Sequence, residues 1–178
     1  MTQPDTAVAP SDVDFRITRT FNAPRALVFR TMTETEHLQH WWGPKGCRIT
    51  VKSHDPRPGG MFHYCMHFPG DVDIWGRFVY REITPTERIV FINGFADAEG
   101  KAIANPMSPD WPFEMLNTTT LVEQGGKTVL TLLSQPINAT ELERTNFLEG
   151  HASMQGGFGG MYDVYEQYLA TIQQQKGG

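Results

Sequence analysis

Between about Asn138 and Gln174, apolar residues recur every three or four positions, the spacing of one face of an α-helix. Aromatic and methionine side chains dominate this stripe, which consists of Phe147, His151, Met154, Phe158, Met161, Tyr162, Tyr165, Leu169 and Ile172. Asn138 is placed to cap the helix, and Glu141 three residues later completes a capping-box pattern. Because a long helix is only marginally stable in isolation, we expect a large sheet to grip it.

Much of the preceding chain alternates between apolar and polar residues, which is the two-residue period of β-strands. The clearest strand directs four side chains to one face: Phe62, Tyr64, Met66 and Phe68. Its other face carries His63, Cys65 and His67. Turns rich in glycine and proline separate most of the predicted strands, which cover residues 13–21, 47–54, 61–68, 72–83, 88–95, 113–123 and 127–135.

Two short helices are predicted after the first strand. The first begins at Asn22-Ala23-Pro24, with Asn22 or Ala23 as its cap and Pro24 in its first turn. The second covers residues 34–40 and ends before Gly43.

Strands followed by a helix indicate an α+β domain with its helices on one face of an antiparallel sheet. We predict a curved sheet of about seven strands wrapped around the long C-terminal helix, in a single domain at residues 13–175. Residues 1–12 lack periodicity and are predicted to be a disordered tail. The long segment 96–112 contains several prolines and is expected to be a lid, a binding loop or disordered.

The composition is that of a globular protein, with 39% hydrophobic and 20% charged residues. A net charge of −5 argues against nucleic acid and anionic membranes as partners, because both require a basic face. The sequence has no apolar run of membrane-spanning length and no signal-peptide pattern, so we expect a cytoplasmic protein. Two cysteines, Cys47 and Cys65, make neither a disulfide framework nor a closed metal site. We predict no cofactor.

Six motifs follow one another along the chain: Phe21-Asn22-Ala23-Pro24 with Val28-Phe29, Trp41-Trp42-Gly43-Pro44, Arg57-Pro58-Gly59-Gly60 before Phe62, Gly76 with residues 82–91, Gly125-Gly126-Lys127-Thr128, and Gly157-Phe158 through Tyr168-Leu169. Their order and spacing over residues 15–169 resemble the SRPBCC, or START-like, superfamily. Within it, the chain is most similar to the branch related to the C-terminal domain of activators of heat-shock chaperone ATPase. The resemblance implies a helix-grip fold with an internal cavity. The family usually has Trp where this chain has Phe158, so an indole N–H donor is lost.

The implied cavity would lie between the sheet and the long helix. From the sheet and short helices, its predicted lining residues are Trp41, Trp42, Phe62, Tyr64, Met66, Phe78, Phe91, Phe113 and Met115. From the long helix they are His151, Met154, Phe158, Met161, Tyr162 and Tyr165. Methionine and aromatic side chains suit an adaptable apolar pocket. A completely filled core would show the same stripes, and the sequence leaves both alternatives open.

The candidates for chemical roles among the histidines are His151 and the pair His63 and His67. His151 would orient a ligand or act as an acid or base near neutral pH; the alternatives are a core histidine bonded to a backbone carbonyl and one exposed at the cavity rim. His63, Cys65 and His67 superficially suggest a metal site. Residues four apart on a strand are separated by about 13 Å, and those two apart by about 6–7 Å. We therefore predict no metal site and place these side chains on the outer face of the sheet.

Several glycines fall within the long helix, where each costs about 1 kcal/mol relative to alanine. Gly156 and Gly160 are four residues apart, a spacing found in close helix–helix contacts. We predict a kink near Gly156–Gly160, or a homodimer contact at that place.

The leading hypothesis is binding of a small hydrophobic or aromatic ligand without catalysis. A second hypothesis is an enzyme resembling polyketide cyclases or dehydratases, with His151, Tyr64 and Tyr162 as its inward polar groups. A third is a co-chaperone-like interaction domain that regulates a heat-shock chaperone ATPase through an exposed apolar patch near Trp42, Trp111 or segment 96–112. The two-domain activators have a further N-terminal domain that these residues do not accommodate, which argues against the third. The sequence leaves open whether the protein is an enzyme.

Overall fold

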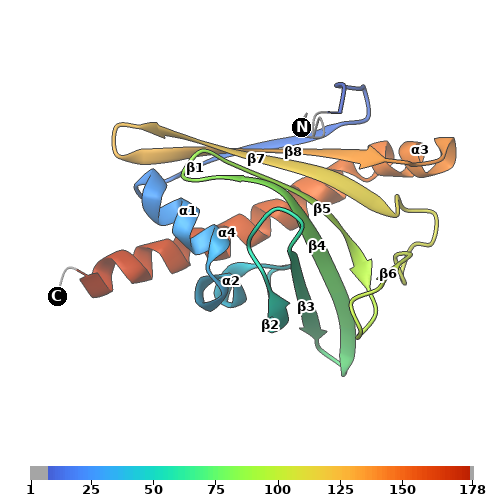
Figure 1. Cartoon of the computed structure of the whole chain (residues 1–178), viewed down its shortest axis with the longest axis horizontal. Coiled ribbons are helices and arrows are strands. Elements are labelled where there is room, and N and C mark those ends of the chain that lie inside the picture. The colour runs from blue at the N-terminus through green and yellow to red at the C-terminus, as the bar shows by residue number, and fades with distance from the viewer. Residues whose placement is uncertain (1–7, 177–178) are drawn as a thin grey trace.

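One curved antiparallel sheet encloses a long helix in the computed structural model, which describes residues 8–176 (Figure 1). The strands are β1 Phe15–Phe21, β2 Arg48–His54, β3 Met61–Phe68, β4 Val72–Thr84, β5 Arg88–Ala96, β6 Ala102–Ile103, β7 Glu114–Gln124 and β8 Lys127–Ile137. Their order in the sheet is β1-β8-β7-β5-β4-β3-β2, with the short β6 paired to β5. The predicted α+β fold with about seven main strands is confirmed, and β6 is an addition inside segment 96–112.

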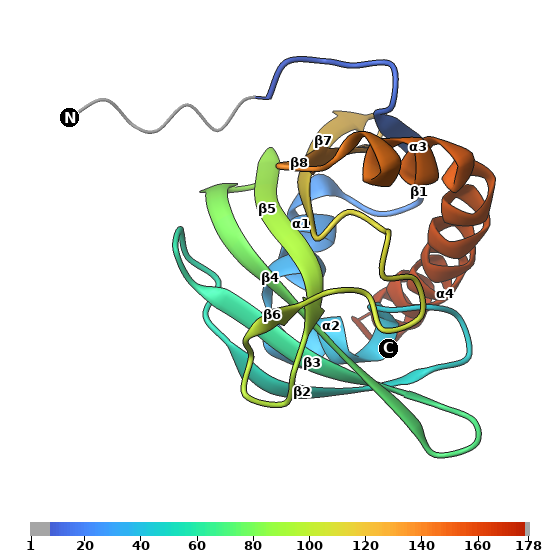
Figure 2. The same cartoon turned by 90° about the vertical axis from the view of Figure 1, so that its right-hand side faces the viewer.

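Four helices complete the fold: α1 Arg25–Thr33, α2 Thr35–Trp41, α3 Glu141–Glu149 and α4 His151–Lys176. Figure 2 shows the sheet curling around one side of the molecule while α4 closes the opposite side. The first helix begins one residue later than the predicted start, with Pro24 as its N-cap. No helix within residues 8–176 is long and apolar enough to cross a membrane.

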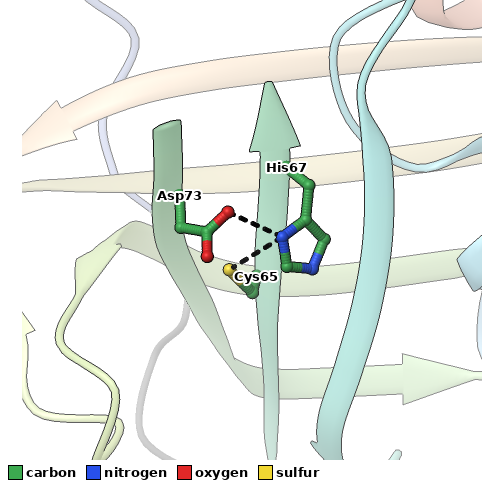
Figure 3. Close-up of side chains that lie close together, drawn as sticks. All are labelled: Cys65, His67 and Asp73. Carbon is green, nitrogen blue, oxygen red and sulfur yellow. Dashed lines mark hydrogen bonds and ion pairs between the residues drawn. The ribbon is translucent and has the colours of Figure 1, made fainter. Parts of the chain in front are cut away.

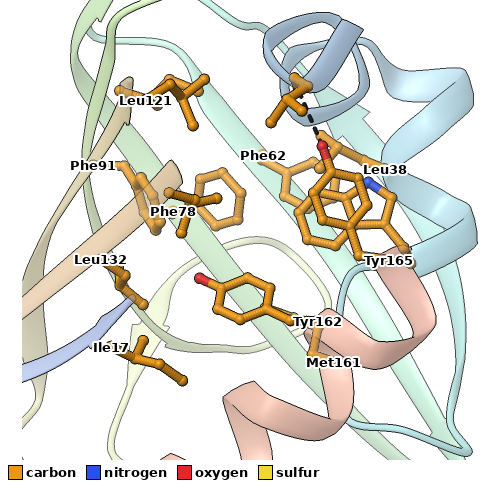
Figure 4. Close-up of a cluster of buried hydrophobic side chains, with 14 of the residues drawn as sticks. Ile17, Leu38, Phe62, Phe78, Phe91, Leu121, Leu132, Met161, Tyr162 and Tyr165 are labelled. Carbon is orange, nitrogen blue, oxygen red and sulfur yellow. Dashed lines mark hydrogen bonds between the residues drawn. The ribbon is translucent and has the colours of Figure 1, made fainter. Parts of the chain in front are cut away.

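The C-terminal half of α4 is anchored to α1 and α2 by Tyr165, which is completely buried. Its ring stacks on Trp41 with ring centroids 3.9 Å apart, and its hydroxyl donates to the Val28 carbonyl at 3.0 Å. The same hydroxyl lies 2.6 Å from the Thr31 hydroxyl, and the Trp41 indole donates to the Thr31 carbonyl at 3.0 Å. Figure 4 shows Tyr165 among Leu38 and other buried side chains. This end of the interior is filled, and these polar atoms are paired.

The start of the C-terminal helical region differs from the prediction by two residues. Asn138 lies outside the helix with φ of 51°, a left-handed conformation that asparagine tolerates better than most residues. The N-cap of α3 is Thr140, whose hydroxyl accepts from the Glu143 backbone N–H at 3.2 Å. The Glu143 carboxylate accepts from the Thr140 N–H at 2.9 Å, which completes the capping box.

The predicted single helix is two helices, and Gly150 separates them. A Cβ atom at Gly150 would lie 2.7 Å from the Trp111 ring, so the absence of a side chain lets Trp111 approach the backbone. Helix α4 runs without interruption through Gly156–Gly160, and the kink predicted there stays a prediction. The homodimer contact stays a prediction.

The predicted disordered tail lies partly outside the described residues, which begin at Val8. The backbone carbonyls of Val8 and Ala9 accept from the Gln135 side chain at 3.3 Å. The Ser11 hydroxyl accepts from Arg144 at 3.3 Å. These contacts connect residues 8–11 to β8 and α3.

Candidate functional site

An apolar cavity of about 270 Å³ lies between the N-terminal half of α4 and the concave side of the sheet. Strands β3, β4, β5 and β7, helix α4 and two connecting segments contribute to its wall. Its lining residues are Trp42, Gly43, Pro44, Tyr64, Met66, Phe68, Ile74, Gly76, Asn93, Gly94, Phe95, Met107, Met115, Met154, Gly157, Phe158 and Met161. The structure therefore contains a cavity where a filled core was the alternative.

The strand period explains the β3 and β4 part of this wall. Tyr64 and Met66 are two residues apart on β3, and their partners across the β3–β4 pair are Gly76 and Ile74. A Cβ atom at Gly76 would lie 2.5 Å from the Tyr64 hydroxyl oxygen. Glycine at this position therefore allows the tyrosine to lie against β4, and a larger residue would displace the phenol.

The cavity wall contains two prominent polar groups and no charged side chain. Asn117 donates to the Asn93 side-chain oxygen at 2.6 Å, which leaves the Nδ2 group of Asn93 as a donor toward the cavity. Burial raises the pKa of Tyr64 to about 12, so its phenol is neutral at physiological pH. A charged ligand would lose its hydration here without a compensating partner. The site therefore favours neutral molecules.

A second cavity of about 30 Å³ lies directly behind the first and is large enough for about one water molecule. Trp42, Asn93 and Phe158 line both cavities and form the partition between them. The rings of Trp42 and Phe78 meet edge to face with centroids 5.2 Å apart, which packs one side of this partition.

The structure divides the predicted lining residues into three groups. The larger cavity is lined by Trp42, Tyr64, Met66, Met115, Met154, Phe158 and Met161. The smaller cavity is lined by Trp41, Phe78, Phe91 and Tyr162, besides the shared partition. Neither cavity is lined by Phe62, Phe113, His151 or Tyr165.

His151 is bonded to a backbone carbonyl, which is one of the structural alternatives to a ligand-binding role. Its Nε2–H donates to the Val13 carbonyl at 2.9 Å. The rings of Phe15 and Phe147 lie on either side of this contact, each with its centroid 5.5 Å from that of the imidazole. The histidine therefore connects α4 to the segment before β1 and does not face the cavity.

Phe62, Tyr165 and Phe113 also differ from their predicted positions on the cavity wall. Phe62 is completely buried, with its ring centroid 4.7 Å from that of Phe78, and Tyr165 belongs to the stack with Trp41. Phe113 lies one residue before β7 and is 41% exposed. Strand alternation does not yet apply at that position, so periodicity assigned its side chain to the wrong environment.

Several cavity residues were missed by sequence reasoning. Ile74 and Gly76 follow the same alternation as Phe78, so the pattern contained the signal for them. Asn93 and Phe95 lie on β5 two and four residues after Phe91, which was predicted to line the cavity, so the strand alternation contained the signal for them too. Met107 comes from segment 96–112, which has no periodicity from which its direction could be predicted.

The outer face of β3 is partly covered, although the sequence suggested an open sheet face. His63 and Cys65 are buried. The His63 imidazole donates to the Asp97 carbonyl at 2.9 Å, and its ring lies 4.9 Å from that of Trp75. The β5–β6 connection therefore covers this part of the outer face.

A curved antiparallel sheet gripping a long C-terminal helix defines the SRPBCC, or START-like, class of proteins. The model of the family described as "Activator of Hsp90 ATPase homolog 1-like protein" matches residues 22–170. The chain belongs to this family, as the motifs predicted. The search of curated proteins found no match to the chain.

Solved structures of bacterial proteins share the fold. A protein from Arthrobacter aurescens superposes with a TM-score of 0.75 at 22% identity, covering 93% of this chain and 92% of its own. Protein Ms6760 from Mycobacterium smegmatis has a TM-score of 0.72 at 22% identity, with coverages of 90% and 92%. Protein NE0264 from Nitrosomonas europaea has a TM-score of 0.71 at 23% identity, with coverages of 93% and 99%. At these identities the likeness is evidence for the fold alone.

Proposed function

We propose that this protein binds a small, neutral, hydrophobic or aromatic molecule in the cavity beside α4. The observation that carries the proposal is the cavity of about 270 Å³ with its uncharged, mostly apolar wall. A cavity of about 150 Å³ in another protein accepts benzene, and drug-sized pockets begin at about 300 Å³. The size therefore suits a molecule of one or two rings.

The wall also supports a preferred orientation for such a ligand. Asn93 lies at the partition and offers N–H donors, while the Tyr64 hydroxyl provides a second polar contact. A ligand with an apolar body and one carbonyl or ether oxygen would match this wall. Methionines, including Met66, Met115 and Met154, make up much of the remaining surface and adapt to different ring shapes.

The test uses 6-propionyl-2-dimethylaminonaphthalene, a neutral two-ring dye with one carbonyl oxygen whose fluorescence emission shifts to shorter wavelength in apolar surroundings. Met154→Trp adds an indole to the cavity wall and is expected to weaken dye binding at least tenfold. The matched control is Leu148→Trp, which adds the same group to α3 at a position that is 46% exposed. Equal dye affinity in both variants and the wild type would contradict the proposal. Displacement of the dye by naphthalene or indole would then rank candidate ligands.

The two alternative functions have weaker support. A cyclase or dehydratase needs a proton-transfer group in the cavity, but His151 points elsewhere, and the raised pKa of Tyr64 keeps its phenol protonated at neutral pH, so it is not available as a general base. A co-chaperone-like role would rest on Met107 and Phe113, which are 70% and 41% exposed. Trp42, expected in that patch, lines the cavity instead.

A further inference from the structure

Three potential metal ligands meet on the face of the sheet opposite to α4 (Figure 3). Cys65 and His67 are two residues apart on β3, and Asp73 is the direct partner of His67 across the β3–β4 pair. The Cys65 sulfur lies 3.9 Å from His67 Nδ1, and the same nitrogen lies 2.7 Å from an Asp73 carboxylate oxygen. The separation of about 6–7 Å expected from strand spacing is therefore wrong for the ligand atoms, because the side chains converge.

We propose that Cys65, His67 and Asp73 form a zinc-binding site. In a tetrahedral site, Zn–S distances of about 2.3 Å and Zn–N or Zn–O distances of about 2.1 Å place neighbouring donor atoms roughly 3.3–3.6 Å apart. The sulfur and nitrogen need to approach by about 0.3 Å, and the carboxylate oxygen needs to move back from the nitrogen by about 0.7 Å. Small side-chain rotations are sufficient, because the Asp73 side chain is 56% exposed.

The donor set selects the metal. A thiolate, an imidazole and a carboxylate are all established zinc ligands, whereas calcium and magnesium bind almost entirely through oxygen. Cys65 and Asp73, once deprotonated, supply two negative charges that balance the charge of Zn²⁺. Zinc binds the thiolate form of cysteine, so metal binding releases the Cys65 thiol proton to solvent.

The other ring nitrogen of His67 already has a partner that would orient the imidazole. His67 Nε2 lies 2.8 Å from the Thr50 hydroxyl on β2. Without metal, Nδ1–H donates to Asp73 and Nε2 accepts from Thr50. When Nδ1 binds zinc, the single ring proton moves from Nδ1 to Nε2 by exchange with solvent, and the Nε2–H then donates to the Thr50 oxygen. Such contacts to the second nitrogen are typical of zinc-bound histidines.

A hollow beside the cluster provides access from solvent and room for a fourth ligand such as water. His67 and Asp73 line it together with Asp71 and Arg48. Its two carboxylates outnumber the single guanidinium, so the local charge favours a cation. The site lies on the opposite face of the sheet from the cavity, and the proposal does not depend on the proposed ligand binding.

A second group of potential metal ligands lies elsewhere on the molecule and can be compared with the proposed zinc site. Glu34, Glu36 and His37 also bring three potential ligand atoms together, but they include no thiolate. A metal bound there would give no sulfur signature. A spectroscopic probe can therefore distinguish the two places.

The experiment titrates the reduced, metal-free chain with Co²⁺ and then displaces the cobalt with Zn²⁺. We expect one equivalent of cobalt to produce a thiolate-to-cobalt charge-transfer band and strong tetrahedral d–d absorption. Cys65→Ser should abolish the charge-transfer band, whereas Cys47→Ser, the matched control, should retain it. Asp73→Asn should weaken zinc binding at least tenfold while retaining the band. Thr50→Val should weaken it by about tenfold, as expected for a positioning residue.

Circular dichroism of every variant separates loss of metal from loss of fold, and exposed Asp73 provides the variant least damaging to the core. The thermal midpoint of the wild type and of Cys47→Ser should rise when zinc is added, because a ligand that binds only the folded state stabilises it. A wild-type titration without the sulfur band would overturn the proposal. So would a band that survives in folded Cys65→Ser, or unchanged zinc affinity in Asp73→Asn.

Discussion

Phe158 provides the most direct test of the cavity, because its ring separates the two voids beside α4. The ring stacks near Phe15 with centroids 5.7 Å apart and lies 6.2 Å from the ring of Tyr162. Phe158→Ala removes this partition without changing a charge or a hydrogen bond. We therefore expect one continuous cavity in place of two.

The expected cost follows from the volume removed. Truncating the ring removes about 100 Å³, and at about 24 cal/mol per Å³ the cavity contributes about 2.4 kcal/mol. Phe158 is partly buried, so the lost transfer free energy is smaller than for a completely buried ring. We expect the free energy of unfolding to fall by about 3 kcal/mol, at the lower end of the range for Phe→Ala. The merged void would measure about 400 Å³ if its wall did not relax.

Urea denaturation measures the stability change, and neutral dyes of increasing ring number measure the size of the site. Phe158→Ala should bind larger ring systems more tightly relative to small ones. Phe147→Ala is the matched control, because Phe147 is completely buried but lines neither cavity. The reasoning is refuted if both variants show the same dye preference, or if Phe158→Ala costs less than about 1 kcal/mol.

Three further outcomes are expected. Gly150→Ala should lower the free energy of unfolding by about 1–3 kcal/mol in urea, because the new methyl group would meet the Trp111 ring at 2.7 Å; an unchanged value would show that the ring is free to move. Gly156→Ala should raise the free energy of unfolding by about 1 kcal/mol, because an added Cβ meets nothing within 4 Å. A lower free energy of unfolding, or a changed elution volume in size-exclusion chromatography, would indicate that a second chain covers this face of α4. Burial raises the pKa of Tyr64 to about 12 and raises that of Tyr162, whereas an unfolded tyrosine ionises near pH 10. As the pH rises, these tyrosines therefore lose their protons in the unfolded state before they do in the folded state. We expect the free energy of unfolding, measured by urea denaturation, to fall as the pH rises from about 10 toward 12. Tyrosinate absorbance from all tyrosines of the folded protein near pH 10 would contradict this.

Local periodicity was sufficient to predict the sheet and the helices but not the division of the C-terminal helix. Phe147, His151 and Met154 keep helical spacing across Gly150, so the apolar stripe does not show the break. Gly150 itself has φ of −80° and ψ of −3°, within the right-handed helical region. Trp111, which is distant in sequence, packs against Gly150 at the break, and a local pattern contains no information about that contact.

Predictions for the site depended on the type of segment. On β3 and α4 the period fixes which side chains face inward, and Tyr64, Met66 and Phe158 line the cavity as expected. The period cannot show whether an inward side chain contacts protein or empty space. Phe62, on the same face of β3 as Tyr64, meets other rings and leaves no void beside it. That difference depends on how far the sheet and the helix are separated at each point, which is a property of the assembled fold.

The two halves of α4 differ in how closely they pack against the rest of the fold. Leu169 and Tyr165 in the C-terminal half are buried, and the Tyr165 hydroxyl is bonded to α1. The N-terminal half contains Gly156, Gly157 and Gly159, where an added Cβ meets no atom within 4 Å. These glycines weaken the helix by about 1 kcal/mol each, and packing in the other half can offset that cost. Between the His151 contact at its first residue and the Tyr165 stack, α4 leaves space against the sheet, and Met154 and Met161 line that space with their flexible side chains. Filling that space with larger apolar residues should stabilise the fold and abolish dye binding together, which links the two properties to the same volume.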